Sequence, residues 1–237
     1  FYTGTEIKPS KADLGKIVIH NVASGNNPDE TLKDDEWEIT GYSNNINASK
    51  YDANGKATTF GYVEIKVKGD SSYANQTYKV PFEIQPLLVT GDTITVPKTI
   101  SYNKGYSSTD ASDYKVPVVV VAKDATGKIV KTLTADDYTV KYEYVNAYKK
   151  NGATNEIGDK IQATVTIKND NYKGFTTVKD NNGQNKTVQN VKVPATNATE
   201  ITAKALADSM IKVEPSSYTY TGGNIIPEFY VVDGAII

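Results

Sequence analysis

The sequence of 237 residues contains no cysteine and only one histidine, His20. Without cysteine, the chain can form no disulfide, no thiol nucleophile and no cysteine-based metal site. A Ser-His-Asp triad would have to use His20, which directly follows the strand-like run Ile17–Ile19, so we interpret this histidine as structural. The Gly-x-Ser-x-Gly and P-loop patterns are absent as well. The sequence therefore gives no indication of a nucleophilic or nucleotide-dependent catalytic site.

An excess of one charge and a long apolar run are also lacking. Lysine and arginine total 26 residues against 28 aspartates and glutamates, a net charge of −2 at pH 7. Nucleic-acid binders usually carry a basic face, so we expect no nucleic-acid partner. The longest apolar stretch, Val116–Ala122, spans seven residues and contains a proline, whereas a membrane helix needs about 20. We therefore expect no membrane insertion.

Tyrosine, by contrast, is abundant, with 17 residues among many valines, isoleucines and threonines. Apolar and polar residues alternate in several segments, for example Val-Glu-Ile-Lys-Val-Lys at 63–68 and Ala-Thr-Val-Thr-Ile-Lys at 163–168. A strand with one polar and one apolar face is typical of antiparallel sheets. The composition and the alternation together predict an all-β fold of antiparallel β-sandwiches.

The strand patterns recur at a long interval. The segment Trp37–Ile39 returns as Tyr138–Val140 after 101 residues, whereas Tyr42 returns as Tyr142 after 100. The difference of one residue predicts a β-bulge in the first copy, and Gly41 is the candidate for it.

Later segments show that the second copy is longer. Ile94 returns as Ile211 after 117 residues, so the second copy carries about 17 extra residues between Tyr172 and Glu200. These residues follow a strand–turn–strand pattern with an Asn-Gly pair, which predicts a projecting β-hairpin at 175–198. We expect a strand followed by a connection at 199–209, although its alanines and lysines could also suit a helix.

The intervals divide the chain into three units. Residues 1–91 form a unit whose first strand is missing, residues 92–208 form the unit with the inserted hairpin, and residues 209–237 are the opening strands of a third. The connections Leu87–Gly91 and Ala205–Asp208 are short, which suits a stiff rod better than a flexible string. We interpret the chain as part of a longer array.

The alternation also predicts the core. In the first unit the expected core residues are Ile17, Ile19, Trp37, Ile39, Val63, Ile65, Val67, Phe82 and Ile84. In the second unit they are Val118, Val120, Tyr138, Val140, Val165, Ile167 and Ile201.

A set of motifs carries a resemblance to a known family. The matching residues are Tyr2-Thr3-Gly4, Ile7, Pro9, Tyr42–Ala48, Gly69, Tyr73, Phe82 and Ile84, then Asp137-Tyr138, Val140, Tyr142, Asn146-Ala147, Tyr172 and Gly174, and finally Tyr220-Thr221-Gly222 and Pro227. The pattern resembles the Ig-like tandem repeats of large bacterial surface proteins, common in Gram-positive gut bacteria. It departs from them at the 175–198 hairpin and at Trp37, where the family has tyrosine.

The resemblance implies tandem Ig-like sandwiches without catalytic residues or cofactors. It implies a non-enzymatic structural or adhesive module of a secreted, cell-wall-associated protein, which acts as a stiff spacer or adhesin stalk on the bacterial cell surface. The expected partners are neighbouring repeats of the same chain, with a host or cell-wall glycan or protein as a further possibility. The alternative is a carbohydrate-binding accessory module of a glycan-degrading protein.

Whether a tyrosine recurs in both units helps to distinguish a structural module from a carbohydrate-binding one. Tyrosines that recur in both units should serve the scaffold, as corner hydroxyls bonded to the backbone or as rings on the core: Tyr42, Tyr73, Tyr142 and Tyr172. Those that recur less regularly are better candidates for a surface contact: Tyr106, Tyr114, Tyr144 and Tyr148. Among them, Tyr144 and Tyr148 are the candidate ligand-binding residues.

Other chemistry is less well supported. We expect Trp37 in the core, and the aspartate pairs at 34–35 and 136–137 in turns at strand starts rather than as a glycosidase pair, because adjacent strand residues face opposite ways. The oxygen-rich segments at 52–55 and 180–183 suit turns better than calcium loops. A covalent amide cross-link between lysine and asparagine would need a lysine side chain that points into the core. The lysines instead occupy the outward-facing positions of the alternating strands. A hydrolase remains the third hypothesis.

Overall fold

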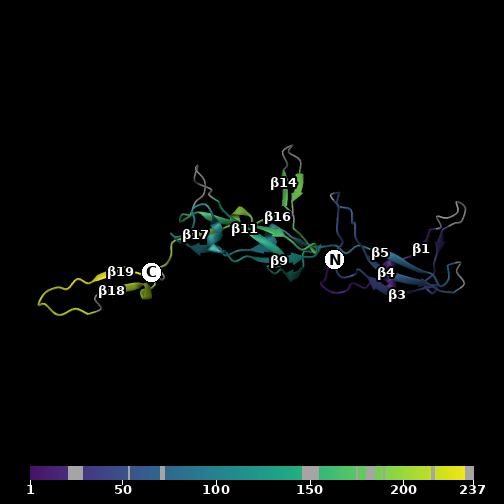
Figure 1. Ribbon diagram of the computed structural model, residues 1–237, viewed down its shortest axis with the longest axis horizontal. Helices are drawn as coiled ribbons and strands as arrows, with labels where there is room; N and C mark the ends of the chain where they lie inside the picture. The colour runs from purple at the N-terminus through teal and green to yellow at the C-terminus, as the bar shows by residue number, and fades with distance from the viewer. Residues whose placement is uncertain are drawn as a thin grey trace.

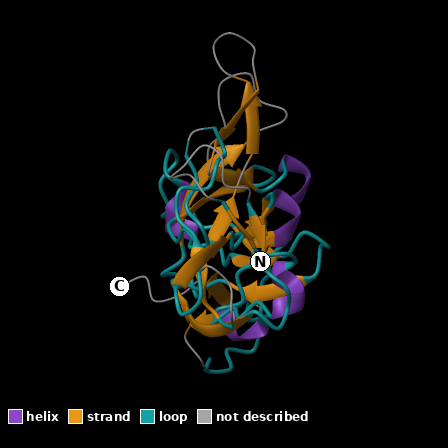
Figure 2. Cartoon of the chain, turned by 90° about the vertical axis from the view of Figure 1, so that its right-hand side faces the viewer, coloured by secondary structure: helices purple, strands orange, loops and turns teal. Residues whose placement is uncertain are grey.

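The computed structural model describes residues 1–20, 29–52, 54–69, 73–145, 155–174, 176–179, 185–188, 190–214 and 217–232. Across these residues the chain is almost entirely β, with one four-residue helix and four short 3-10 turns. Figure 1 shows the strands spread along an elongated molecule, and Figure 2 shows how little of the chain is helical. The predicted all-β fold class is therefore confirmed.

The elements in chain order are α1 (Lys11–Leu14), β1 (Val18–Ile19), β2 (Glu30–Thr31), β3 (Trp37–Ser43), β4 (Gly61–Val67), β5 (Thr77–Phe82), β6 (Leu87–Val89), η1 (Gly91–Thr93), β7 (Ile94–Thr95), β8 (Thr99–Ser101), η2 (Ala111–Tyr114), β9 (Val119–Lys123), β10 (Ile129–Thr132), β11 (Tyr138–Val145), β12 (Lys160–Ile167), β13 (Tyr172–Gly174), β14 (Thr176–Lys179), β15 (Asn185–Val188), β16 (Asn190–Lys192), η3 (Ala195–Asn197), β17 (Thr199–Thr202), η4 (Asp208–Met210), β18 (Ile211–Glu214) and β19 (Glu228–Val231). We refer to residues 1–86 as the N-terminal region, 87–202 as the central region and 203–232 as the C-terminal region.

The N-terminal region contains an antiparallel sheet of β3, β4 and β5 and a small sheet of β1 and β2. Val63, Ile65 and Val67 alternate along β4 and are fully buried, as their spacing of two residues requires. The register between β3 and β4 shifts between Ile39 and Gly41. This shift confirms the bulge that the unequal intervals predict.

The central region contains two five-stranded sheets. One has the order β10-β9-β6-β13, with β7 also paired to β9, and the other has the order β11-β12-β17-β8, with β16 also paired to β12. Most pairs are antiparallel, but β6 with β13 and β8 with β17 are parallel. A large apolar cluster that includes Val120, Val165 and Val191 is buried in this region.

The predicted core residues are all buried or partly buried, but Ile84 packs in the cluster of the central region and not in that of the N-terminal region, to which the prediction assigned it. Fully or almost fully buried members are Ile17, Trp37, Val63, Ile65, Val67, Ile84, Val120, Val165, Ile167 and Ile201. The remaining members are partly buried and pack against the same clusters: Ile19, Ile39, Phe82, Val118, Tyr138 and Val140.

Two tyrosines occupy matching positions in the N-terminal and central regions. The Tyr42 hydroxyl donates to the carbonyl oxygen of Pro9 at 2.9 Å, and the Tyr142 hydroxyl donates to that of Val116 at 2.7 Å. Tyr42 is paired with Val63 across the sheet, and Tyr142 is paired with Ala163. The predicted role of these two tyrosines as corner hydroxyls is confirmed.

The turns before β3 and β11 also match. The carboxylate of Glu36 accepts the N–H of Lys33 at 2.8 Å, and that of Asp137 accepts the N–H of Thr134 at 2.9 Å. In both turns the acidic residue donates its own N–H back to the carbonyl oxygen of that partner. The predicted turn role is confirmed for Asp137. Before β3 the turn is formed by Glu36 and not by the predicted aspartate pair at 34–35, because Glu36 stands three residues after Lys33, as Asp137 stands three residues after Thr134.

A second acid-centred turn recurs at Asp52 and Asp124. Each carboxylate accepts the backbone N–H groups of the residues two and four positions later. This is the Asx-turn geometry in which a side chain replaces a backbone acceptor. The turn predicted at 52–55 is therefore present.

The first part of the inserted segment forms a hairpin, with β14 and β15 paired antiparallel from Thr176–Val188 to Lys179–Asn185. The prediction of a hairpin over the whole of 175–198 is wrong for the later residues, because β16 pairs with β12 in the sheet of the central region. The hairpin projects from the central region (Figure 1); its Asn-Gly pair lies outside the described residues. The strand predicted after residue 199 is β17. In the C-terminal region β18 pairs with β19 and, among the described residues, with no other strand; the described side chains of both strands are exposed. Among the described residues, no helix has the length and apolar composition needed to cross a membrane.

Candidate functional site

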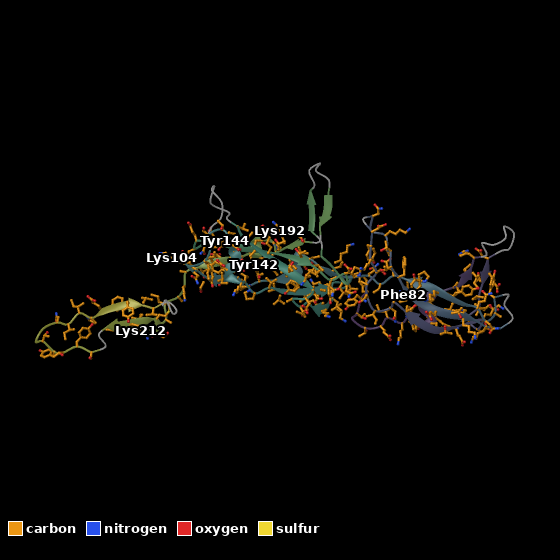
Figure 3. All side chains as sticks on the ribbon, viewed as in Figure 1. Phe82, Lys104, Tyr142, Tyr144, Lys192 and Lys212 are labelled. Carbon is orange, nitrogen blue, oxygen red and sulfur yellow. The ribbon has the colours of Figure 1, made fainter. Side chains whose placement is uncertain are left out.

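Of the two candidate ligand-binding tyrosines, Tyr148 lies outside the described residues. Tyr144 lies on β11, two residues after Tyr142 (Figure 3). Its hydroxyl donates to the carbonyl oxygen of Ser107 at 2.8 Å. Burial, with smaller effects from Tyr114 and nearby aspartates, raises the pKa of Tyr144 to about 12. The hydrogen bond from this hydroxyl connects β11 to the loop at Ser107.

A buried amide organises the neighbouring tyrosines. The side-chain oxygen of Asn155 accepts from the Tyr114 hydroxyl at 2.6 Å, and its nitrogen donates to the carbonyl oxygens of Asn103 and Tyr106. The rings of Tyr106 and Tyr114 meet edge to face, with centroids 4.8 Å apart. Burial raises the pKa of Tyr114. These side chains bind two loops together around one buried amide. The prediction of a surface contact is wrong for Tyr114, which is 6% exposed and belongs to a buried apolar cluster.

His20 and Trp37 also have defined positions. His20 is exposed at the end of β1, with Nδ1 2.7 Å from the carboxylate of Asp29. Trp37 is 1% exposed, which confirms the prediction that it belongs to the core. The ammonium group of Lys11 lies 4.2 Å from the centre of its ring, a favourable cation–π distance.

The N-terminal and central regions contact each other at a site that we call the joint. One apolar cluster includes Tyr2 and Ala48 from the N-terminal region and Leu87 and Tyr172 from the central region. The rings of Tyr2 and Tyr172 meet edge to face at 5.8 Å. Phe82 packs against both this cluster and the core of the N-terminal region (Figure 3). The apolar cores are therefore continuous across the joint.

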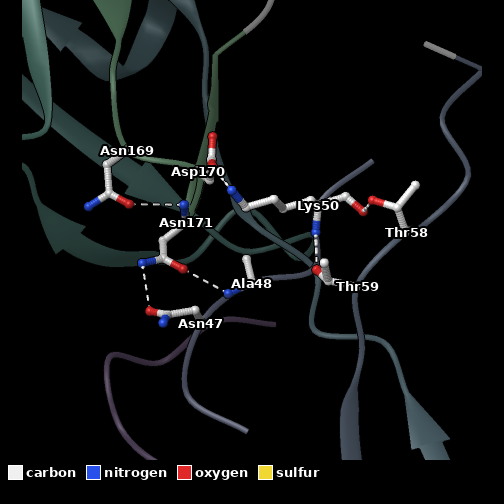
Figure 4. A network of polar contacts seen from close by, with 8 residues as sticks. All are labelled: Asn47, Ala48, Lys50, Thr58, Thr59, Asn169, Asp170 and Asn171. Carbon is white, nitrogen blue, oxygen red and sulfur yellow. Dashed lines mark hydrogen bonds and ion pairs between the residues drawn. The ribbon is translucent and has the colours of Figure 1, made fainter. Parts of the chain in front are cut away.

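Asn171 supplies the polar part of the joint (Figure 4). Its side-chain oxygen accepts the N–H of Ala48 at 2.7 Å, and its side-chain nitrogen donates to the Asn47 side-chain oxygen at 3.2 Å. Its carbonyl oxygen accepts the N–H of Leu87 at 3.0 Å. One residue of the central region thus bonds to the N-terminal region and to the strand that connects them.

The loop that carries Asn171 is itself fixed. The side-chain oxygen of Asn169 accepts the N–H of Asn171 at 3.0 Å, and its nitrogen donates to the carboxylate of Asp137 at 2.8 Å. Lys50 and Asp170 form an ion pair at 3.1 Å (Figure 4), but both are largely exposed. Exposed ion pairs add little stability, so we assign the joint to Asn171 and the apolar cluster.

The connecting residues are part of a sheet. Leu87–Gly91 is predicted to be a connection, but Leu87–Val89 form β6, which is parallel to β13 and antiparallel to β9. Leu87 and Val89 are at most 1% exposed. The apolar run Leu-Leu-Val is the sequence signal for this strand. The joint residue Asn171 had no such signal, because its role depends on how the two regions meet.

Two grooves lie in the N-terminal region. One, of about 590 Å³, is lined mainly by polar residues at 44–50 and 58–59, with Phe60 and Tyr62 beside them. The other, of about 480 Å³, lies between β1 and β5 and is lined mainly by apolar side chains. In the part of the chain that the structure describes, no group of three or more His, Cys, Asp or Glu side chains is placed to hold a metal ion.

Comparison with known proteins finds no match to this chain among family models, curated proteins or solved structures.

Proposed function

We propose that this chain is a non-enzymatic spacer or adhesin-stalk module of a large bacterial cell-surface protein, built from Ig-like β-sandwiches in tandem. The observation that carries the proposal is the joint. Tyr2, Phe82 and Tyr172 make the apolar cores continuous across it, and Asn171 bonds to backbone and side chain on the other side.

Such a joint favours a fixed angle between the two regions. Bending would expose buried rings and would leave the N–H of Ala48 without its acceptor, and both changes cost free energy. The strand β6 connects the regions without a flexible linker. A series of joints of this kind would hold a distal domain away from a cell wall. The matching tyrosine corners and acid-centred turns support the tandem interpretation.

The proposal is tested by measuring the distance between the regions. Because the chain has no cysteine, spin labels can be placed at Lys33→Cys and Lys141→Cys, whose native side chains are 79% and 75% exposed. We expect one narrow distance distribution from pulsed electron resonance. Asn171→Ala should broaden it, whereas the matched variant Asn197→Ala, at an exposed position away from the joint, should not. A broad distribution in the parent protein would refute the stiff spacer.

The second candidate function, a carbohydrate-binding accessory module, is favoured by the 590 Å³ groove. Phe60 and Tyr62 lie there beside the amide side chains of Asn44 and Asn47, and rings next to amides suit a sugar, whose ring has apolar faces and polar edges. A glycan array tests this function. We expect Tyr62→Ala to abolish any glycan signal and Tyr220→Ala, at an 82% exposed position, to retain it. A silent array would count against this candidate.

A further inference from the structure

The strand β11 has an open edge in the middle of the chain. It is a terminal strand of the sheet β11-β12-β17-β8, and within the described residues it pairs with β12 alone. The register with β12 runs without interruption from Tyr138–Ile167 to Val145–Lys160. A long and regular edge strand of this kind can accept a strand from another molecule.

The hydrogen bonds of β12 show which backbone groups lie at this edge. The N–H of Val193 donates to the carbonyl oxygen of Ala163 at 3.0 Å, so the backbone groups of Ala163 point away from β11. Ala163 pairs with Tyr142. Residues of an antiparallel pair alternate between hydrogen-bonded and non-hydrogen-bonded positions, so the backbone groups of Tyr142 point away from β12, to the free edge. Those of Val140 and Tyr144, two residues before and after it, do the same.

The polar face of β11 carries opposite charges on either side of Tyr142. Lys141 and Glu143 form an ion pair at 2.8 Å within the strand, and their side chains are 75% and 42% exposed. Glu143 also lies 3.7 Å from the ammonium group of Lys192 on β16. The strand therefore presents complementary charges that are placed symmetrically about Tyr142.

Charge selects one register for a second copy that pairs antiparallel with this edge. With Tyr142 opposite the same residue of the second copy, each Lys141 lies opposite a Glu143, and each Val140 lies opposite a Tyr144. A pairing centred on Lys141 or on Glu143 would place like charges opposite each other, and one centred on Val140 or on Tyr144 would leave Lys141 without a carboxylate opposite it. Opposite charges on facing positions favour strand pairing, and like charges oppose it.

The equivalent strand of the N-terminal region lacks such an edge. The strand β3 holds Tyr42 where β11 holds Tyr142, but its register with β4 shifts between Ile39 and Gly41. A bulge bends the strand and interrupts its edge, which is one of the ways in which edge strands are kept from pairing. The regular edge of β11 is thus a difference between two otherwise matching strands.

The same side of the central region also exposes apolar side chains. The strand β10 is a terminal strand of the other sheet, and only residues 133–137 connect it to β11, so the two edges lie on one side. Ile129 and Val130 of β10 are 57% and 41% exposed. A second copy on this side can cover them, and the burial of apolar surface adds to the backbone hydrogen bonds.

We infer that two copies of this chain pair through β11 as a symmetric dimer. The two-fold axis passes between the two copies of Tyr142, each Lys141 faces the Glu143 of the other copy, and the sheets of both copies join into one. Because both copies contribute the same surface, the contact closes on itself and association stops at the dimer.

Sedimentation velocity of the full chain over a concentration series tests the dimer. We expect the average mass to rise from 25.8 kDa toward twice that value and no further. A chain that stays monomeric at every concentration would show that the edge serves another partner or none, and would overturn the inference. Assembly beyond the dimer would overturn it as well.

Charge reversal tests the register. Lys141→Glu and Glu143→Lys should each weaken association about fourfold or more, because two attractive pairs become two repulsive ones. An equimolar mixture of the two variants should associate as well as the parent chain, since every glutamate then faces a lysine. The control Lys79→Glu, at a 59% exposed position of β5, should leave association unchanged. Unchanged association of either single variant, or no recovery in the mixture, would overturn the inference.

A cysteine pair tests the same register at the level of single residues. Positions 141 and 143 of the two copies form a non-hydrogen-bonded pair with Cα atoms about 4.5 Å apart, a distance that a disulfide can span. A mixture of the separate variants Lys141→Cys and Glu143→Cys should therefore form a mixed disulfide under mild oxidation. The control mixture of Thr139→Cys with Glu143→Cys should not, because these positions lie diagonally. Equal cross-linking in both mixtures would overturn the inference.

The dimer and the stiff spacer can fail independently. Spin-labelled chains diluted with unlabelled chain report only the distance within one molecule. A monomeric chain would therefore leave the stiff-spacer proposal standing, and a flexible joint would leave the dimer standing.

Discussion

Removal of one tyrosine hydroxyl should destabilise the region of the chain to which that tyrosine belongs. The Tyr42 hydroxyl donates to the carbonyl oxygen of Pro9 at 2.9 Å, and Tyr42→Phe removes this bond without changing the ring. A hydrogen bond of this kind contributes about 0.5–1.5 kcal/mol. With a denaturant dependence of about 1–3 kcal/mol per M urea, a loss of about 1 kcal/mol lowers the unfolding midpoint by roughly 0.3–1 M.

The single tryptophan makes the assay specific for the N-terminal region. Trp37 is 1% exposed beside Val63 and Ile65, so unfolding of that core shifts its fluorescence to longer wavelength. We expect Tyr42→Phe to lower the midpoint of this transition. The matched control Tyr220→Phe, at a position that is 82% exposed, should leave it unchanged.

The equivalent change in the central region completes the test. Tyr142→Phe leaves the carbonyl oxygen of Val116, a residue only 2% exposed, without its donor, which costs about 1–3 kcal/mol. This loss should lower the urea-unfolding midpoint measured by circular dichroism of the whole chain. It should change the midpoint measured by Trp37 fluorescence only slightly. If Tyr142→Phe lowered the Trp37 midpoint more than Tyr42→Phe does, the assignment of each tyrosine to the stability of its own region would be refuted.

Two further outcomes follow from the described contacts. A Cβ atom on Gly61 would lie 2.6 Å from the Phe82 ring, so Gly61→Ala should lower stability by about 1–3 kcal/mol in urea unfolding, and an unchanged midpoint would contradict this packing. Burial raises the pKa of Asp137, but hydrogen bonds, chiefly from the Thr134 backbone, outweigh it and hold the pKa below its ordinary value. Ionised Asp137 therefore stabilises the folded chain above about pH 4, and this stabilisation is lost as the pH falls through the lowered pKa of the folded state. Asp137→Asn should flatten this part of the profile of unfolding free energy against pH. An unaltered profile would show that other carboxyl groups determine it.

Much of the fold could be predicted because its signals are local. Alternation at 63–68 and 163–168 identifies the central strands, and the unequal intervals around Tyr42 locate the bulge next to Gly41. The inserted hairpin could be predicted from a strand–turn–strand pattern. Each of these signals lies within about a dozen residues or in a comparison of two such segments.

The joint could not be predicted in the same way. The pairing of β6 with β13 and the bonds of Asn171 connect residues far apart in sequence, and parallel pairing leaves no turn between the strands to mark it. Tyr144 is a related case. Its lack of a regular counterpart makes it a candidate for a surface contact, but no local pattern shows that its hydroxyl reaches Ser107.

The parallel pair β8–β17 has a mechanical consequence. These strands lie near the beginning and at the end of the central region, and Thr99, Ile100 and Ser101 run beside Glu200, Ile201 and Thr202 in the same direction. A pull that separates the start of β8 from the end of β17 would slide one strand along the other, so the backbone bonds between them would share the load. Such shear loading resists force far better than unzipping from one end.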